Sequence, residues 1–293
     1  MTGRHAAPVR WSGAARGLAG RIAAANPMTL AGATMIVAMT AFCFAGPLFY
    51  RTDLVHVNLL LGNRRPGAGH LLGTDADGVD VLGRLMRGGQ LSLVVGMAAG
   101  LLGAVIGSLW GAVAGYLGGV ADAVMMRVVD AVIAIPALVL LLLLTAIYPP
   151  SPAVLVLVIA ATSWLGTARL VRGEALTLRS REYVQAVRML GGGRARAIFL
   201  HIAPNALGTI AVSVSFQIAD AILLLATLSY LGLGVQPPSS DWGDMIAGGV
   251  QYIYDGYWWE IYPAGLAIIV VVVAFNLVGD GLRDSFGSGQ RRR

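Results

Sequence analysis

The chain has 293 residues, of which 57% are hydrophobic and only 12% are charged, and its mean hydropathy is +0.73. Soluble domains carry about 25% charged residues, so this composition is typical of an integral membrane protein. The single cysteine excludes an internal disulfide, and the four scattered histidines argue against a zinc enzyme. A net charge of +6 could indicate nucleic-acid binding, but the arginines cluster beside apolar runs, which favours the positive-inside pattern of membrane proteins.

Apolar runs of about 20 residues, long enough to span a bilayer, recur along the chain. The first follows a tail whose charged residues are all arginine. A secretory signal is the alternative interpretation, but its apolar core would be only about 7–15 residues, so we expect an uncleaved anchor helix. The sequence therefore predicts an all-α integral membrane protein with six spans, at 28–49, 91–116, 124–147, 153–171, 206–233 and 261–278.

The positions of the arginines predict the orientation of these spans. The N-terminal tail, the segment 169–204 and the C-terminal residues are all positively charged. An even number of spans places all three on one side, which the positive-inside rule makes the cytoplasm. The predicted organisation is then a cytoplasmic tail at 1–27, an anchor helix at 28–50, an extracytoplasmic segment at 51–90, a core of five spans at 91–282 that contains the 169–204 loop, and a cytoplasmic tail at 283–293.

Glycines recur at three- and four-residue spacing along the second span, at 96, 100, 103, 107, 111 and 115. Small residues on one helix face allow two helix backbones to approach closely in lipid. We therefore expect this face to pack against a neighbouring helix, with a pore lining as the alternative.

Ionisable residues within spans are candidates for the translocation path. Asp122, Arg127 and Asp130 open the third span, where we expect a structural role with Asp130 close enough to pair with Arg127. Asp220 lies near the middle of the span 206–233, where an unpaired charge costs about 2.5–3.5 kcal/mol. It should face the interior of the bundle or a water-filled path, and a role in translocation stays open for both Asp130 and Asp220.

The outward segment 234–260 is rich in aromatic residues. The simpler interpretation is a belt at the lipid headgroups, and contact with a substrate is the alternative. The residues concerned are Trp242, Tyr252, Tyr254, Tyr257, Trp258 and Trp259.

The segment 169–204 is the most basic part of the chain, with seven arginines against two glutamates. A helix over 179–190 would have one apolar face at helical spacing, formed by Tyr183, Ala186, Val187 and Leu190. The glycine triplet that begins at Gly191 would end it, and a second short helix would lead to Pro204 at the entry to the next span. Such an element either docks a soluble partner or lies on the lipid surface, and periodicity does not separate these two possibilities.

The spacing of this loop resembles the Glu-Ala-Ala loop of ABC-importer permeases. Gln185-Ala186-Val187 is followed by three residues and Gly191, and Pro204 keeps the family's distance from that glycine. The departures are Gln185 for Glu, Val187 for the second Ala, His201 for Ile and Ala203 for Leu.

Three other segments are similar to the dipeptide, oligopeptide and nickel subfamily of these permeases. They are Leu72-Gly73-Thr74-Asp75 with Gly78-Val79-Asp80, Leu228-Ser229-Tyr230-Leu231-Gly232 with Pro237-Pro238 and Trp242-Gly243, and Asn276-Leu277-Val278-Gly279-Asp280. Val79 stands where the subfamily has Arg, and Leu225 where an acidic residue is common.

The resemblance implies a MetI-like type I importer permease fold with an extra N-terminal helix, and a function as the C-type permease subunit of a bacterial di- or oligopeptide importer in the plasma (inner) membrane. It implies a homologous B-type permease, two cytoplasmic ATPases that use ATP and Mg²⁺, and an extracytoplasmic substrate-binding protein as partners. The implied ATPase-docking residues are Glu182, Tyr183, Gln185, Ala186, Val187, Leu190, Gly191 and Pro204. The chain has no lysine and no phosphate-binding loop, so we expect it to be neither an ATPase nor another enzyme and to hold no cofactor or metal.

An ion-coupled secondary transporter is the main alternative from another class. It would use Asp130 and Asp220 as proton carriers, but no inverted repeat is evident. An intramembrane enzyme would need a catalytic motif that the sequence does not contain. Within the importer family, nickel, sugars and other small solutes remain open as ligands, and so does export.

Overall fold

The computed structural model describes residues 26–53, 56–181, 203–236 and 238–290. In this part of the chain all regular elements are helices, as predicted. The long ones are α2 (Pro27–Phe49), α3 (Val81–Leu117), α4 (Gly119–Ile133), α5 (Ala137–Ile147), α6 (Pro152–Arg179), α9 (Ala203–Tyr230), α10 (Trp242–Val250) and α11 (Tyr262–Gln290). Short 3-10 turns occur at Leu59–Leu61 (η1), Ile253–Asp255 (η3) and Trp258–Glu260 (η4).

Five of the helices are long and apolar enough to cross a membrane, namely α2, α3, α6, α9 and α11 with its preceding turn. The predicted third span, 124–147, is not one continuous helix: α4 and α5 are bent by 81° at a break between them. Pro136 precedes α5 at this break, and a proline in a helix interior removes a backbone hydrogen bond and clashes with the preceding turn. The predicted total of six spans agrees with the structure when this bent pair counts as one span.

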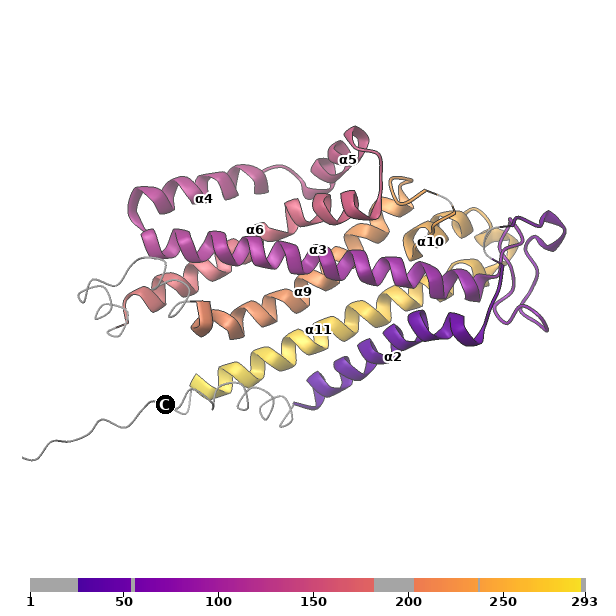
Figure 1. Ribbon diagram of the computed structural model, residues 1–293, viewed down its shortest axis with the longest axis horizontal. Coiled ribbons are helices and arrows are strands. Elements are labelled where there is room, and N and C mark those ends of the chain that lie inside the picture. The colour runs from indigo at the N-terminus through magenta and orange to yellow at the C-terminus, as the bar shows by residue number, and fades with distance from the viewer. Residues whose placement is uncertain (1–25, 54–55, 182–202, 237, 291–293) are drawn as a thin grey trace, which may run out of the picture.

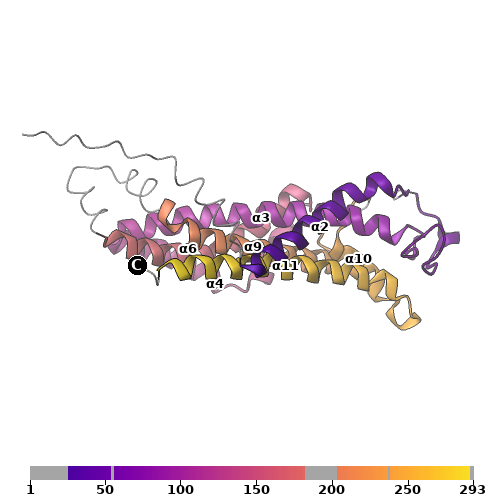
Figure 2. The ribbon, with the colours of Figure 1, turned by 90° about the horizontal axis from the view of Figure 1, so that it is seen from below.

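The long helices α2, α3, α6, α9 and α11 run roughly along one common direction and form a flat, elongated bundle (Figures 1 and 2), whereas α5 is inclined to them. α3 packs against both α6 and α9, and α11 lies between α9 and α2. The start of α2, the end of α6, the start of α9 and the end of α11 gather at one end of the bundle (Figure 1). The segment after α2 and the short helix α10 lie at the opposite end, which we call the loop end (Figure 1).

Several helices extend beyond the predicted spans. α3 begins at Val81 rather than 91, α6 continues to Arg179 rather than 171, and α11 continues to Gln290 rather than 278. α3 has 37 residues and is therefore about 55 Å long, whereas the hydrocarbon core of a bilayer is about 30 Å thick. Its polar first turns therefore project beyond the apolar run that hydropathy detects.

The glycine face of α3 packs against neighbouring helices, as predicted. A Cβ at Gly107 would overlap the carbonyl oxygen of Trp164, and one at Gly111 would overlap that of Ala168, both on the backbone of α6. Towards the loop end, a Cβ at Gly100 would lie 2.8 Å from the Cα of Ile218 on α9. These glycines let three helices meet at backbone distance.

Candidate functional site

The predicted coupling loop, 169–204, begins inside α6, so residues 169–179 continue the spanning helix and do not belong to a loop. The helix continues to Arg179, and Ser180 follows as its C-cap. The expected helix over 179–190 therefore does not begin at Arg179, which is the last residue of α6. The candidate docking residues Glu182, Tyr183, Gln185, Ala186, Val187, Leu190 and Gly191 lie outside the described residues. Pro204 falls in the first turn of α9, where a missing backbone N–H costs least.

Two arginines of the basic segment are engaged in ion pairs on the bundle. Arg172 donates from Nε to Asp122 Oδ1 at 2.5 Å and from Nη2 to Asp122 Oδ2 at 2.7 Å. Arg169 donates to Asp130 Oδ1 at 2.6 Å. Asp130 thus pairs with Arg169 of α6, whereas the sequence suggested Arg127 of its own helix as the partner. Both ion pairs join α4 to the C-terminal half of α6.

A buried polar cluster joins α6 to α9, and sequence analysis did not single it out. The Thr167 and Ser213 hydroxyls lie 2.5 Å apart, and the Gln217 amide donates to the carbonyl oxygen of Ser163 at 2.8 Å and to Thr167. Gln217 Oε1 is buried without a hydrogen-bond partner among the described residues. The sequence did contain a signal for this cluster, because its polar side chains stand within apolar runs. In lipid, such side chains form hydrogen bonds between neighbouring helices.

Asp220 was predicted to face either the interior of the bundle or a water-filled path. It does not face the interior of the bundle that this chain forms. Its side chain is exposed on α9, and it forms no hydrogen bond or ion pair with any residue that the structure places. The same exposed stripe of α9 contains Leu223, Thr227 and Tyr230 at helical spacing. A mid-span carboxylate on such a face requires water or another protein surface, because contact with lipid would be costly.

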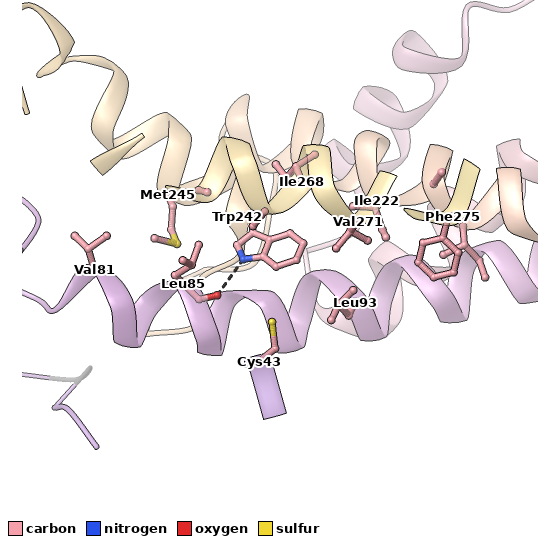
Figure 3. Packing of buried hydrophobic residues seen from close by; sticks show 14 of the residues in the cluster. Cys43, Val81, Leu85, Leu93, Ile222, Trp242, Met245, Ile268, Val271 and Phe275 are labelled. Atoms are coloured by element: carbon pink, nitrogen blue, oxygen red, sulfur yellow. Dashed lines mark hydrogen bonds between the residues drawn. The ribbon is translucent and has the colours of Figure 1, made fainter. Parts of the chain in front are cut away.

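Two tryptophans of the outward segment are structural and do not belong to an aromatic belt. Trp242 is fully buried, and its indole N–H donates to the carbonyl oxygen of Leu85 at 3.0 Å (Figure 3). Cys43 of α2 and Met245 of α10 belong to the same buried cluster (Figure 3). Trp259 is 2% exposed and donates to the carbonyl oxygen of Thr74 at 3.1 Å. The belt prediction was therefore wrong for Trp242 and Trp259, whereas Tyr254 and Trp258 are exposed.

The segment that resembles the family's Leu-Gly-Thr-Asp motif folds into a polar cap over α3. Asp80 is the N-cap of α3 and accepts from the Gly83 backbone N–H at 2.7 Å. Its other oxygen accepts from the Tyr50 hydroxyl at 2.9 Å and lies 2.9 Å from His70 Nδ1. Burial, together with the hydrogen bond to Asp80, raises the pKa of Tyr50 above its usual value. Asp80 therefore links the end of α2 to the start of α3.

A second carboxylate, Asp241, joins α9 to α10. It is fully buried, caps α10 by accepting from the backbone N–H groups of Gly243 and Asp244, and accepts from the Ser229 hydroxyl at 2.5 Å. Burial raises the pKa of Asp241, and these hydrogen bonds act in the opposite direction. Asp241 thus joins the end of α9 to the start of α10.

The family model for the binding-protein-dependent transport system inner membrane component matches residues 107–292, which is more than half of the chain. The chain belongs to this family. It is 37% identical to the oligopeptide transport system permease protein OppC of Bacillus subtilis, over 91% of this chain and 87% of the relative. It is 40% identical to the probable D,D-dipeptide transport system permease protein DdpC of Escherichia coli, over 88% of this chain and 87% of that protein. The dipeptide transport system permease protein DppC of Bacillus subtilis is 35% identical to it, over 91% of this chain and 83% of that protein.

The chain is therefore a multi-pass permease subunit of a transport system and not an enzyme. The matched region begins inside α3 and includes both ion pairs, the polar cluster, Asp220 and the coupling segment. The similarity to the three relatives covers 88–91% of this chain.

Proposed function

We propose that this permease is one of two homologous membrane subunits of an ATP-driven, binding-protein-dependent importer of di- or oligopeptides in the bacterial inner membrane. Its termini would face the cytoplasm, where two ATPases that bind ATP and Mg²⁺ would dock, and a binding protein would deliver peptides from the opposite side. The observation that carries this function is the similarity over about nine tenths of the chain to proteins named as peptide permeases.

The coupling element would be the segment between α6 and α9. Its docking residues are Glu182, Tyr183, Gln185, Ala186, Val187, Leu190 and Gly191, with Pro204 at the entry to α9. Gln185 can accept hydrogen bonds but cannot form a salt bridge, so apolar contacts and the turn at Gly191 would contribute more to docking than charge. The Asp122–Arg172 pair would transmit movement of the docked segment to α4, because it joins the two helices directly.

The translocation path would follow the exposed face of α9 that contains Asp220 and Thr227. Asp220 lies on this face without a partner among the described residues, and the cost of placing a charge in lipid favours a water-filled path shared with the second permease. Asp130 is a weaker candidate because Arg169 already neutralises it. Movement of the two permeases between two arrangements would alternately open this path, driven by ATPase contacts that differ between the states.

Reconstitution tests this function directly. The chain would be purified with its partner permease, ATPases and binding protein, placed in proteoliposomes, and assayed for uptake of radiolabelled alanyl-alanine and trialanine. We expect uptake only when ATP and all partners are present. Uptake by this chain alone, driven by a proton gradient, would instead identify an ion-coupled transporter. Uptake of nickel but not of peptides under the same conditions would retain the importer and change its ligand.

A further inference from the structure

An acidic cavity opens at the loop end of the bundle, between the start of α3 and α10. Its volume is about 140 Å³, which is more than a single water molecule requires. Four carboxylates line it, from Asp75, Asp77, Asp244 and Glu260, against one guanidinium from Arg84. Its lining is therefore net negative when all of these groups are charged.

Arg84 is already bound to other lining groups. It forms ion pairs with Asp75 and with Asp244, the latter at 3.2 Å, and also donates to the Ser240 hydroxyl at 3.2 Å. Asp75 in addition accepts from the backbone N–H groups of Asp77 and Val79. Among the described residues the Arg84 guanidinium forms no hydrogen bond or ion pair with Glu260, so the acidic excess of the cavity remains.

Glu260 is the residue that distinguishes this cavity from an ordinary surface cluster. Its side chain lines the cavity and the residue is only 4% exposed. Its Oε1 atom is buried and has no hydrogen-bond partner among the described residues. A buried carboxylate oxygen without a partner is costly, so a hydrogen-bond donor that enters the cavity would be stabilised there.

The chemistry of the lining selects the kind of donor. Within the described residues, no group of three or more His, Cys, Asp or Glu side chains is placed to hold a metal ion. A carboxylate in a net-negative cavity binds a positively charged donor more strongly than a neutral one. The volume accommodates the head of a cationic side chain or a terminal amine. These features together favour an organic cation.

We infer that this cavity is a binding site for an ammonium or guanidinium group, with Glu260 as its acceptor. The inference builds on the importer function proposed above, because two sources of such a group would then reach this end of the bundle. One is the α-ammonium group of a peptide, and the other is a basic side chain of the docked binding protein.

Two pairs of variants test the site. Glu260→Gln removes the charge with almost no change in size, and Asp255→Asn removes an exposed carboxylate from the neighbouring turn that does not line the cavity. Gly248→Lys places an ammonium group at the cavity itself, and Gly248→Met is its uncharged control. Gly248 lies on the cavity wall, and a Cβ there meets no atom within 4 Å, so both substitutions can begin without a clash with the backbone.

Binding would be measured on the assembled transporter in nanodiscs, in two arms. One arm measures the affinity of the transporter for the binding protein. The other compares the affinity of the transporter for radiolabelled alanyl-alanine with its affinity for the N-acetylated form of this peptide. We expect Glu260→Gln to weaken one of these affinities about tenfold, Gly248→Lys to weaken the same one at least as much, and both controls to leave it unchanged. A response of the first arm identifies a basic side chain. A response of the second, with no binding of the N-acetylated peptide, identifies the α-ammonium.

Unchanged affinities in both arms for Glu260→Gln and Gly248→Lys would overturn the site, as would an equal effect of Asp255→Asn. In either case, ATP-dependent uptake by the wild-type complex would still support the importer function. If the wild-type complex took up peptides without ATP or did not retain the ATPases, the importer function itself would fail.

Discussion

Arg172 of α6 binds Asp122 of α4 through two parallel hydrogen bonds, at 2.5 and 2.7 Å. The side chains are 34% and 10% exposed, so this pair is better shielded from water than Arg169–Asp130, whose side chains are 50% and 47% exposed. Bidentate geometry and partial burial both strengthen an ion pair. Of the two ion pairs that join the first half of the bent span to α6, Arg172–Asp122 should therefore be the stronger.

A double-mutant cycle should detect this difference. Asp122→Asn, Arg172→Gln and the double variant would be compared by equilibrium unfolding in mixed micelles. We expect a coupling energy of about 1–2 kcal/mol, because each single change leaves a partly buried partner unpaired. The same cycle on Asp130 and Arg169 is the matched control and should give about 0.2–1 kcal/mol. Equal coupling energies in the two cycles would contradict the assigned difference.

Close packing of α3 on α6 leads to a second prediction. Gly107→Ala would place a methyl group against the carbonyl oxygen of Trp164, which belongs to the backbone and cannot move aside. We therefore expect the free energy of unfolding to fall by about 1–3 kcal/mol. Gly166→Ala on α6 is the control, since a Cβ there meets nothing within 4 Å. It should be neutral or stabilising, because alanine favours a helix more than glycine does. A Gly107→Ala variant as stable as Gly166→Ala would show that the helices are not in backbone contact.

The sequence was sufficient for features that depend on local patterns. Apolar run length located the spans, and glycine spacing located the packing face of α3, because both are fixed by helix geometry along one segment. The proline at 136 was visible in the sequence, but its effect on the third span was not predicted. Hydropathy also missed the polar ends of α3 and α6, since these lie beyond the apolar run.

Features that depend on contacts between distant segments could not be predicted in the same way. Nothing near Asp122 indicates that its partner is Arg172, and nothing near Trp242 indicates that its indole donates to Leu85. The aromatic residues of the outward segment looked alike in sequence, and only packing separates the buried Trp242 from the exposed Tyr254. Of the candidate site, the coupling residues stay predictions from spacing and resemblance.

The turn at Gly191 provides a third prediction, on coupling. Gly191→Trp should leave the complex assembled and able to hydrolyse ATP but should abolish most peptide uptake, because a bulky residue would displace the docking helix. ATP hydrolysis and uptake would be measured on the same proteoliposomes. Gly173→Trp on the exposed face of α6 is the control and should retain both activities, since a Cβ there meets no atom within 4 Å. Normal binding-protein-stimulated uptake by Gly191→Trp would refute the coupling role.

Asp220 allows a fourth prediction that separates a water-filled path from lipid. If its carboxylate faces the path, Asp220→Asn should reduce peptide uptake by roughly tenfold, as the loss of one charged contact would do, with little change in stability. If it faces lipid, the same change should leave uptake intact and raise stability, because a charge in the hydrocarbon core costs about 2.5–3.5 kcal/mol. We expect the first result.

Thr227→Val is the matched control for this experiment. Thr227 lies on the same exposed face of α9, and its hydroxyl donates only to the carbonyl oxygen of Leu223 in its own helix at 2.8 Å. Its loss removes a polar atom from the face without removing a charge, so uptake should stay close to that of the wild type. Reduced uptake in both variants would indicate that the polarity of the α9 face, rather than the Asp220 charge, supports translocation.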